Sequence, residues 1–272
     1  MNGARVRPSS TTRGVIRLYA ESFAPWCEKA RWALDHHQVP YRYIEHVPML
    51  GEPALRLAAR RPFGHVTVPL LVDGAEVIMG SFDIARRAER DGKEAPLFPP
   101  GHEADVAAWN ERSDVVMTSG RAMLLTRMLR SPDALAEQLP PFIPRAMRPA
   151  LRGMASMGVR FLQRKYEVRA DDQARHEDES RRALDALRSA LSGGRRHLIG
   201  DAPSYADIAM AASLQFVLPV NERYIALGPA TREAWTNAKL ATEYADLLAW
   251  RDALYHEHRR PGGQATTGSS GG

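Results

Sequence analysis

The chain has 272 residues, of which 44% are apolar and 25% charged, and its formal net charge is +5. This length suits one or two globular domains with a proper core. The basic excess is small, and no zinc, helix-turn-helix or RNP-type motif accompanies it, so we do not expect a nucleic-acid-binding protein. The single Cys27 has no disulfide partner, and no metal-binding spacing occurs. We therefore expect a protein without a metal in a reducing cytoplasm.

The two ends of the chain have compositions that differ from the rest. Residues 1–13 contain three arginines and no acidic residue, but they lack an amphipathic stretch, so we predict a disordered N-terminus rather than a transit peptide. Residues 259–272 are rich in Gly, Ser and Thr and are predicted to be a disordered tail. The most apolar window, 208–220, is interrupted by polar residues and is too short to cross a bilayer.

The first half of the chain alternates between strand and helix patterns. Pro25 suits the first turn of a helix because it has no N–H to lose there. Ser81 is predicted to cap a helix that runs to about Asp91. The predicted elements are strands at 15–19 and 41–47, a hairpin of 69–72 and 76–79, and helices from 25, at 52–60 and at 81–91. The order βαβαββα predicts an α/β thioredoxin-like domain over residues 14–98.

Strand patterns stop after a linker at 97–101 that is rich in Pro and Gly. Residues 99–258 are therefore predicted to form an all-α helical-bundle domain. Ser204 and Asp207 have capping-box spacing ahead of an apolar run, which is a folding signal rather than a catalytic one. The predicted helices span 102–130, 142–166, 172–191, 204–218 and 240–257.

Two segments carry a resemblance to a known family. They are Phe23-Ala24-Pro25-Trp26-Cys27 and Thr67-Val68-Pro69-Leu70-Leu71-Val72-Asp73-Gly74, the second followed closely by Gly80-Ser81. In this order, ahead of a helical half, they resemble the glutathione-site elements of the cytosolic glutathione transferases. The phrase Leu198-Ile199-Gly200-Asp201 before the capping box is also similar to that family. The resemblance covers roughly residues 15–257, and it implies glutathione as co-substrate, a small hydrophobic electrophile and a homodimer.

The resemblance assigns the parts of glutathione to particular residues. Val68, before a cis Pro69, is implied to bind the cysteinyl backbone like an added strand, although the same pair also suits the start of an edge strand. Gly80 and Ser81 are implied to hold the γ-glutamyl carboxylate at a helix N-terminus, and Ser81 can act as a helix cap at the same time. Gly80 replaces the family's usual acid or amide. His65 is a candidate for the glycyl carboxylate, or a solvated loop residue.

The thiol end of the site departs from the family. Ala24, beside Pro25, stands where the family often places its catalytic Ser or Cys, and it has no group to donate. The nearest hydroxyls belong to Ser22 and Tyr19, and the nearest thiol to Cys27, so these three are the catalytic candidates. Cys27 is alternatively a small packed side chain.

Charged and apolar residues farther along have more than one interpretation. Lys29 and Arg31 are expected to be charges on a helix surface, or else charges that raise the local positive potential. Trp109, Arg112, Val116 and Met117 have helical spacing and are candidates for the electrophile pocket, or else ordinary core. The basic segment 120–170 is compatible with a lid, a dimer surface, a peripheral membrane patch or a solvated face.

The favoured function is conjugation of glutathione thiolate to a small hydrophobic electrophile, as in detoxification. One alternative is a non-catalytic binding or assembly module, which the absence of a donor at Ala24 and the glycine at Gly80 both favour. The other is a glutathione thiol oxidoreductase that depends on Cys27.

Overall fold

The computed structural model describes residues 15–139, 143–148, 150–169 and 172–260. The predicted disordered segment 1–13 and residues 261–272 of the predicted tail lie outside this range. Arg259 was assigned to that tail, but it is buried and its guanidinium pairs with Glu28 and Asp35. The tail prediction is therefore wrong at Arg259, because composition alone does not reveal an ion pair with a distant helix.

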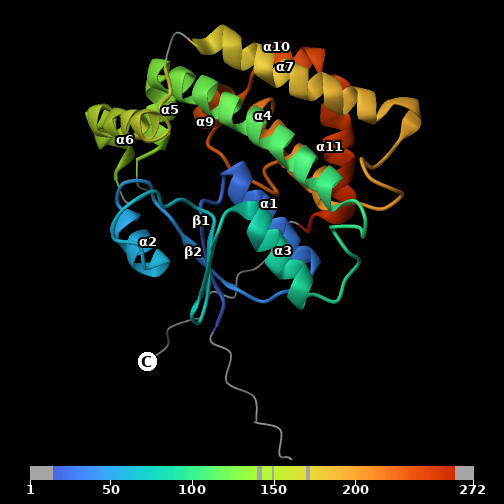
Figure 1. The fold of residues 1–272 in the computed structure, drawn as a ribbon. Helices are drawn as coiled ribbons and strands as arrows, with labels where there is room; N and C mark the ends of the chain where they lie inside the picture. Colours follow the sequence, from blue (N-terminus) through green and yellow to red (C-terminus); the bar gives the residue numbers. More distant parts are fainter. Residues whose placement is uncertain (1–14, 140–142, 149, 170–171, 261–272) are drawn as a thin grey trace, which may run out of the picture.

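The first half forms a four-stranded sheet in the order β2-β1-β3-β4 (Figure 1). β1 is parallel to β2 and antiparallel to β3, which forms a hairpin with β4. The elements are β1 Arg17–Ala20, α1 Pro25–His36, β2 Arg42–Glu45, α2 Glu52–Ala59, β3 Leu70–Asp73, β4 Glu76–Met79 and α3 Ser81–Asp91. Their bounds agree with the predicted ones to within two residues, and the thioredoxin-like arrangement is confirmed.

Two apolar clusters cover the two faces of this sheet. On one face Leu18 and Ala20 of β1 pack with Leu34 of α1 and Ile84 of α3. On the other face, residues of β3 pack with Leu55 of α2. Alternate side chains of a strand point to opposite faces, so the short strands β1 and β3 serve both clusters. The sheet is thus buried between α1 and α3 on one side and α2 on the other.

The start of α3 differs in detail from the prediction. The capping position is occupied by Gly80, and Ser81 is the first helical residue, with no side-chain capping hydrogen bond. Gly80 has φ 100°, in the region that favours glycine because a Cβ is strained there. The prediction that Ser81 is the capping residue is therefore wrong by one position.

Within the described residues, the regular elements of the second half are all helices. The long α4 packs against α7 and α8, and Figure 1 shows it crossing above the sheet domain. The capping box before α8 is confirmed, since the Asp207 carboxylate accepts the N–H of Ser204 at 2.8 Å. The helices are α4 Glu103–Arg130, α5 Pro132–Glu137, η1 Arg145–Met147, α6 Arg152–Lys165, α7 Gln173–Ala190, η3 Ser192–Gly194, α8 Tyr205–Ser213, η4 Leu214–Phe216, α9 Pro229–Trp235, α10 Ala238–Glu243 and α11 Ala245–His258.

Several helix predictions in this half are wrong. Among the described residues of the predicted helix 142–166, residues 145–147 form a 3₁₀ turn and the α-helix begins at Arg152, because prolines in this part of the chain disfavour helical backbone. Residues 142 and 149 of this prediction lie outside the described range. The predicted helix 204–218 changes to a 3₁₀ turn after Ser213, and 240–257 is divided at Tyr244. The short helices α5 and α9 were not predicted at all.

One apolar cluster is shared by both halves of the molecule. Trp32 of α1 and Ala85 of α3 belong to the same buried cluster as Val106 of α4, Leu184 of α7 and Tyr205 of α8. Across the described residues, none of the helices combines the length and the apolar character that crossing a membrane requires.

Candidate functional site

A half-buried piece of backbone with unpaired polar groups precedes β3. The Val68–Pro69 peptide is cis, as the resemblance implied. The Pro69 carbonyl accepts the N–H of Gly80 at 3.1 Å, which holds this segment beside the start of α3. Within the described part of the chain, no hydrogen bond uses the N–H or the C=O of Val68. Both groups are therefore free for an extended ligand that adds to the sheet edge.

The first turn of α3 lies beside this backbone segment, joined to it by the hydrogen bond from Gly80 to Pro69. A helix N-terminus presents free N–H groups and partial positive charge, which suit a carboxylate. Ser81 is 5% exposed at this turn. Burial raises the pKa of the neighbouring Tyr205 hydroxyl, and the Ser81 side chain opposes that rise. Gly80 thus supplies the positive φ that the start of α3 requires, and Ser81 lies at a helix N-terminus suited to an anionic ligand group.

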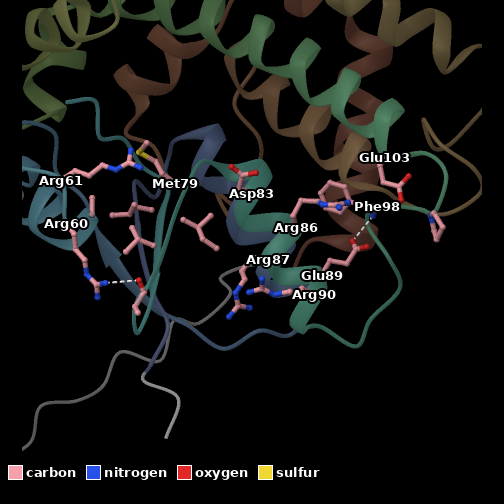
Figure 2. Close-up of a pocket in the computed structure, with 16 residues that line it drawn as sticks. Arg60, Arg61, Met79, Asp83, Arg86, Arg87, Glu89, Arg90, Phe98 and Glu103 are labelled. Atoms are coloured by element: carbon pink, nitrogen blue, oxygen red, sulfur yellow. Dashed lines mark hydrogen bonds between the residues drawn. The ribbon is translucent and has the colours of Figure 1, made fainter. Parts of the chain in front are cut away.

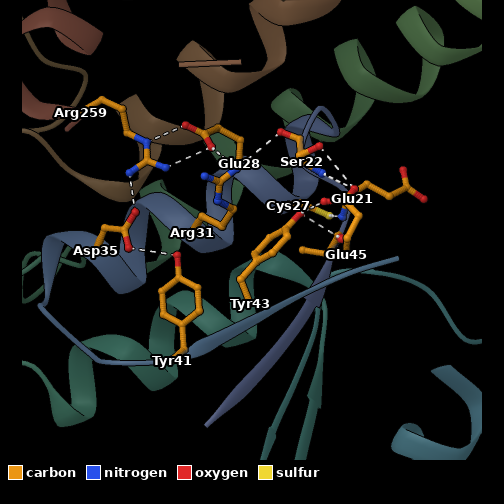
Figure 3. Close-up of polar contacts among 11 residues, drawn as sticks. Glu21, Ser22, Cys27, Glu28, Arg31, Asp35, Tyr41, Tyr43, Glu45 and Arg259 are labelled. Carbon is orange, nitrogen blue, oxygen red and sulfur yellow. Dashed lines mark hydrogen bonds and ion pairs between the residues drawn. The ribbon is translucent and has the colours of Figure 1, made fainter. Parts of the chain in front are cut away.

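The three residues proposed to activate the glutathione thiol lie in or beside the turn between β1 and α1 (Figure 3). Ser22 is exposed, but its hydroxyl donates to Glu45 Oε1 at 3.3 Å, and its N–H donates to the same oxygen at 3.1 Å. The Tyr43 hydroxyl donates to the other oxygen of Glu45 at 2.7 Å. Tyr19 packs with the apolar cluster on the α2 face of the sheet. The Ser22 hydroxyl is therefore engaged by Glu45, and the Tyr19 ring is fixed by apolar packing.

Cys27 lies in the first turn of α1 and is completely buried. Its Sγ accepts the N–H of Glu21 at 3.3 Å, and its side chain packs with Leu18 and Leu34. Burial, followed by the charge of Glu21, raises the pKa of the Cys27 thiol. A buried thiol that stays protonated is a poor nucleophile, so the surroundings suit a packed side chain.

Two charged residues that the sequence did not indicate lie at this turn. Burial, followed by the charge of Glu45, raises the pKa of Glu21 to about 7. The Arg121 guanidinium of α4 lies 4.6 Å from the Trp26 ring centroid and 3.5 Å from that of Tyr166. Its buried Nε has no hydrogen-bond partner among the described residues. A carboxyl group directly after the first strand was a local signal for Glu21, whereas Arg121 is brought here only by the packing of α4.

Lys29 connects the two halves close to this turn. It is fully buried, and its Nζ donates to Asn110 at 2.8 Å, Ser113 at 3.1 Å and Asp114 at 3.1 Å. The expectation of a surface charge at Lys29 is therefore wrong, because its partners lie on α4. Arg31 forms an ion pair with Glu28 on its own helix.

The residues proposed for the electrophile pocket divide into two pairs. Val116 and Met117 are buried in the apolar core. Trp109 is half-buried, and the exposed Arg112 places its guanidinium 4.9 Å from the Trp109 ring centroid. Only this second pair keeps surface that a ligand can contact.

A cavity with a volume of about 1180 Å³ lies elsewhere, along β4 and α3. Figure 2 shows Arg60 and Arg61 on one side of it and Arg86, Arg87 and Arg90 on the other. Its lining includes neither Val68 nor Ser81. His65 is exposed in the loop before Val68, and its side chain has no hydrogen bond or ion pair within the described residues. In the same part of the chain, no group of acidic, His or Cys side chains is placed to hold a metal.

Two family models match the chain. They are the glutathione S-transferase N-terminal domain, over residues 23–91, and the glutathione S-transferase C-terminal domain, over residues 170–253. Together they cover more than half of the 272 residues. No curated protein matches the sequence.

Solved structures with the same fold include three glutathione S-transferases. The one from Methylobacillus flagellatus with GSH bound is 17% identical, with a TM-score of 0.57 over 89% of this chain and 95% of that chain. The one from Methylobacterium radiotolerans in complex with glutathione sulfonate is 16% identical, with a TM-score of 0.58 over 90% and 92%. The one from Ceriporiopsis subvermispora in complex with glutathione is 22% identical, with a TM-score of 0.55 over 91% and 98%. At these low identities, the structural similarity supports the fold alone. The two domain matches identify the family: the chain belongs to the glutathione S-transferases.

Proposed function

We propose that this protein binds glutathione and transfers it to a small hydrophobic electrophile. The observation that carries this proposal is the free N–H and C=O of Val68, held beside the first turn of α3 by the hydrogen bond between Gly80 and Pro69. An extended tripeptide pairs with such a backbone edge, and its γ-glutamyl carboxylate reaches the α3 N-terminus at Ser81. The glutathione-containing relatives support the same ligand. His65 is proposed to contact the glycyl carboxylate.

The sulfur of a ligand bound in this way lies at the turn around Ala24 and Pro25. Reaction requires the thiolate, which attacks the electrophile so that a carbon–sulfur bond forms and the leaving group departs with its electron pair. The N-terminus of α1 stabilises a nearby thiolate by about 0.3–1 kcal/mol, which is less than one pKa unit. Trp26 lies in the first turn of α1, and Arg121 of α4 adds a positive charge beside it. Trp109 and Arg112 are the proposed contacts of the electrophile.

Calorimetric titration with glutathione tests this proposal, combined with the ultraviolet absorbance of the bound thiolate across pH. We expect saturable binding and a thiol pKa below that of free glutathione, followed by turnover of an aryl halide, whose halide is displaced. An isothiocyanate, to which the thiolate adds without a leaving group, and a peroxide, which oxidises the thiol, are further substrates to assay. The variant Ser81→Ala is expected to weaken binding by about tenfold, which corresponds to one lost hydrogen bond. Ser156→Ala on α6 is the control, since that hydroxyl bonds only within its own helix. A wild-type protein that fails to bind glutathione would rule the proposal out.

A glutathione-binding module without turnover is the second candidate. Ala24 has no donor, and the Ser22 hydroxyl already donates to Glu45. Such a module binds glutathione without lowering its thiol pKa, so the same titration separates the two functions. The burial of Cys27 gives no support to a Cys27-dependent oxidoreductase. From the family resemblance we also propose a cytoplasmic homodimer with a role in detoxification.

A further inference from the structure

Glu21 presents a carboxyl group at the thiol end of the candidate site. It follows Ala20, the last residue of β1, and precedes Pro25, the first residue of α1. Its backbone N–H donates to Cys27, but its carboxyl oxygens have no hydrogen bond or ion pair with any described residue. Figure 3 shows the carboxyl group directed away from the network of Ser22, Tyr43 and Glu45.

Charged groups from four other elements surround Glu21 without pairing with it. The acidic ones are Glu45 of β2 and Glu52 of α2, and the basic ones are Lys165 of α6 and Arg121 of α4. Lys165 is occupied by an ion pair with Glu52 at 2.5 Å. The Arg121 guanidinium is stacked between two rings. The remaining titratable neighbours are the Cys27 thiol and the Tyr166 hydroxyl, both of which have a raised pKa and stay protonated at neutral pH.

This setting changes the acid–base behaviour of Glu21. Burial, assisted by Glu45 and Glu52 and opposed by Lys165 and Arg121, raises the pKa of the Glu21 carboxyl from 4.5 to about 7. A base works best when its pKa is near the working pH, because enough of it is deprotonated and it still holds a proton firmly. An ordinary exposed glutamate is too weak a base to take a proton from a thiol of pKa about 8.5.

The other side chains of this turn are less suited to accept that proton. Ala24 has no acceptor, the Ser22 hydroxyl and the Glu45 carboxylate are bonded to each other, and the Tyr19 ring packs with the apolar cluster on the α2 face. Cys27 is buried and protonated. The half-buried Glu21 is the carboxyl side chain of the β1–α1 turn that has no hydrogen bond or ion pair among the described residues.

We propose that Glu21 is the general base of the conjugation reaction and accepts the proton of the glutathione sulfhydryl. This inference rests on the proposed function. The S–H bond breaks and an O–H bond forms on Glu21, so that the carboxyl becomes neutral as the sulfur becomes anionic. The thiolate then forms its bond to the electrophile, the leaving group departs with its electron pair, and Glu21 returns its proton to water. Arg121, whose Nε lacks a partner within the described residues, stabilises the anionic sulfur.

The test compares pH profiles of kcat/KM for glutathione and an aryl halide in the wild type, Glu21→Gln and Glu21→Asp. Wild-type activity is expected to rise through a pH of about 7. The kcat/KM of Glu21→Gln is expected to be at least about 100-fold below that of the wild type at pH 6.5. It is expected to rise only as the free thiol ionises, near pH 8.5. Glu21→Asp keeps a carboxyl and is expected to retain part of the activity. The control is Glu111→Gln, an exposed position on α4.

The outcomes separate this role from simple electrostatics. A carboxylate that only neighbours the thiol opposes its ionisation, so its removal would raise activity at pH 6.5. Glu21→Gln at or above wild-type activity would therefore overturn the general-base role while the transferase function stands. Glutathione affinity in Glu21→Gln is expected within threefold of wild type, and thermal melting verifies that each variant is folded. A wild type that neither binds nor conjugates glutathione would overturn both proposals.

Discussion

The guanidinium of Arg259 donates from Nε to Oε1 of Glu28 over 2.7 Å, which joins the segment after α11 to the first turn of α1 (Figure 3). The two side chains are only 3% and 1% exposed. A second contact runs from Nη1 of Arg259 to Oδ2 of Asp35 over 2.5 Å. The end of the described chain is thus tied to the helix whose first turn forms the thiol end of the candidate site.

Arg259→Ala is expected to destabilise the protein by about 3–5 kcal/mol, because it leaves the buried Glu28 carboxylate without its cation. Chemical denaturation followed by circular dichroism measures this change. Arg260→Ala, at an exposed position, is the control and is expected to change stability by less than about 0.5 kcal/mol. Equal stability of the two variants would contradict the assignment of a buried pair.

Gly120→Ala is expected to destabilise the protein by about 1–3 kcal/mol. A Cβ at Gly120 of α4 would lie 2.4 Å from Cβ of Phe216, so α4 and η4 would have to move apart. Gly153→Ala on α6 is the matched control, since its Cβ would meet nothing within 4 Å. That variant is expected to gain up to about 1 kcal/mol from helix propensity. In the same denaturation assay, we expect Gly120→Ala to lower the free energy of unfolding and Gly153→Ala to raise it.

His37 is predicted to make the protein sensitive to acid. Its ring is buried without a hydrogen-bond partner among the described residues, and burial, followed by the charge of His36, lowers its pKa to about 4. The unfolded chain takes up the proton near pH 6.5 and the folded one only near 4, so stability is full above 6.5 and falls as the pH decreases toward 4.

The folded protein loses stability between pH 7 and 4.5, and we expect His37→Gln to reduce this loss in the free energy of unfolding by about 1–2 kcal/mol. Melting temperatures at the two pH values report the change. His256→Gln, at an exposed position, is expected to leave the slope unchanged. A wild-type slope retained in His37→Gln would assign the acid sensitivity to other groups.

Cys27→Ser is expected to keep conjugation activity and to cost about 1–3 kcal/mol of stability, because a hydroxyl replaces a buried thiol among apolar neighbours. A chromogenic aromatic disulfide is expected to leave the native thiol unmodified and to react after denaturation. Rapid modification of the native protein, with loss of turnover in Cys27→Ser, would instead support an oxidoreductase.

The features that could be predicted from the sequence are those fixed by near neighbours. Val68–Pro69 and the Ser204–Asp207 capping box are local patterns, and both have the expected backbone. Lys29 was assigned to the surface because its partners follow more than 80 residues later, on α4. The surroundings of Glu21 likewise come from α2, α4 and α6, so its setting could not be inferred from the turn alone.

The apolar cluster that contains Trp32, Val106 and Tyr205 has a consequence for how this chain can be divided or recombined. A cut at the linker near Pro99 would leave each fragment with an uncovered apolar surface, so neither fragment has a complete interior of its own. A chimaera made by exchanging one half with a relative would have to replace Trp32, Lys29 and their α4 partners as a set. The two sequence patterns, α/β and all-α, therefore share one apolar cluster, and we expect the two halves to unfold together.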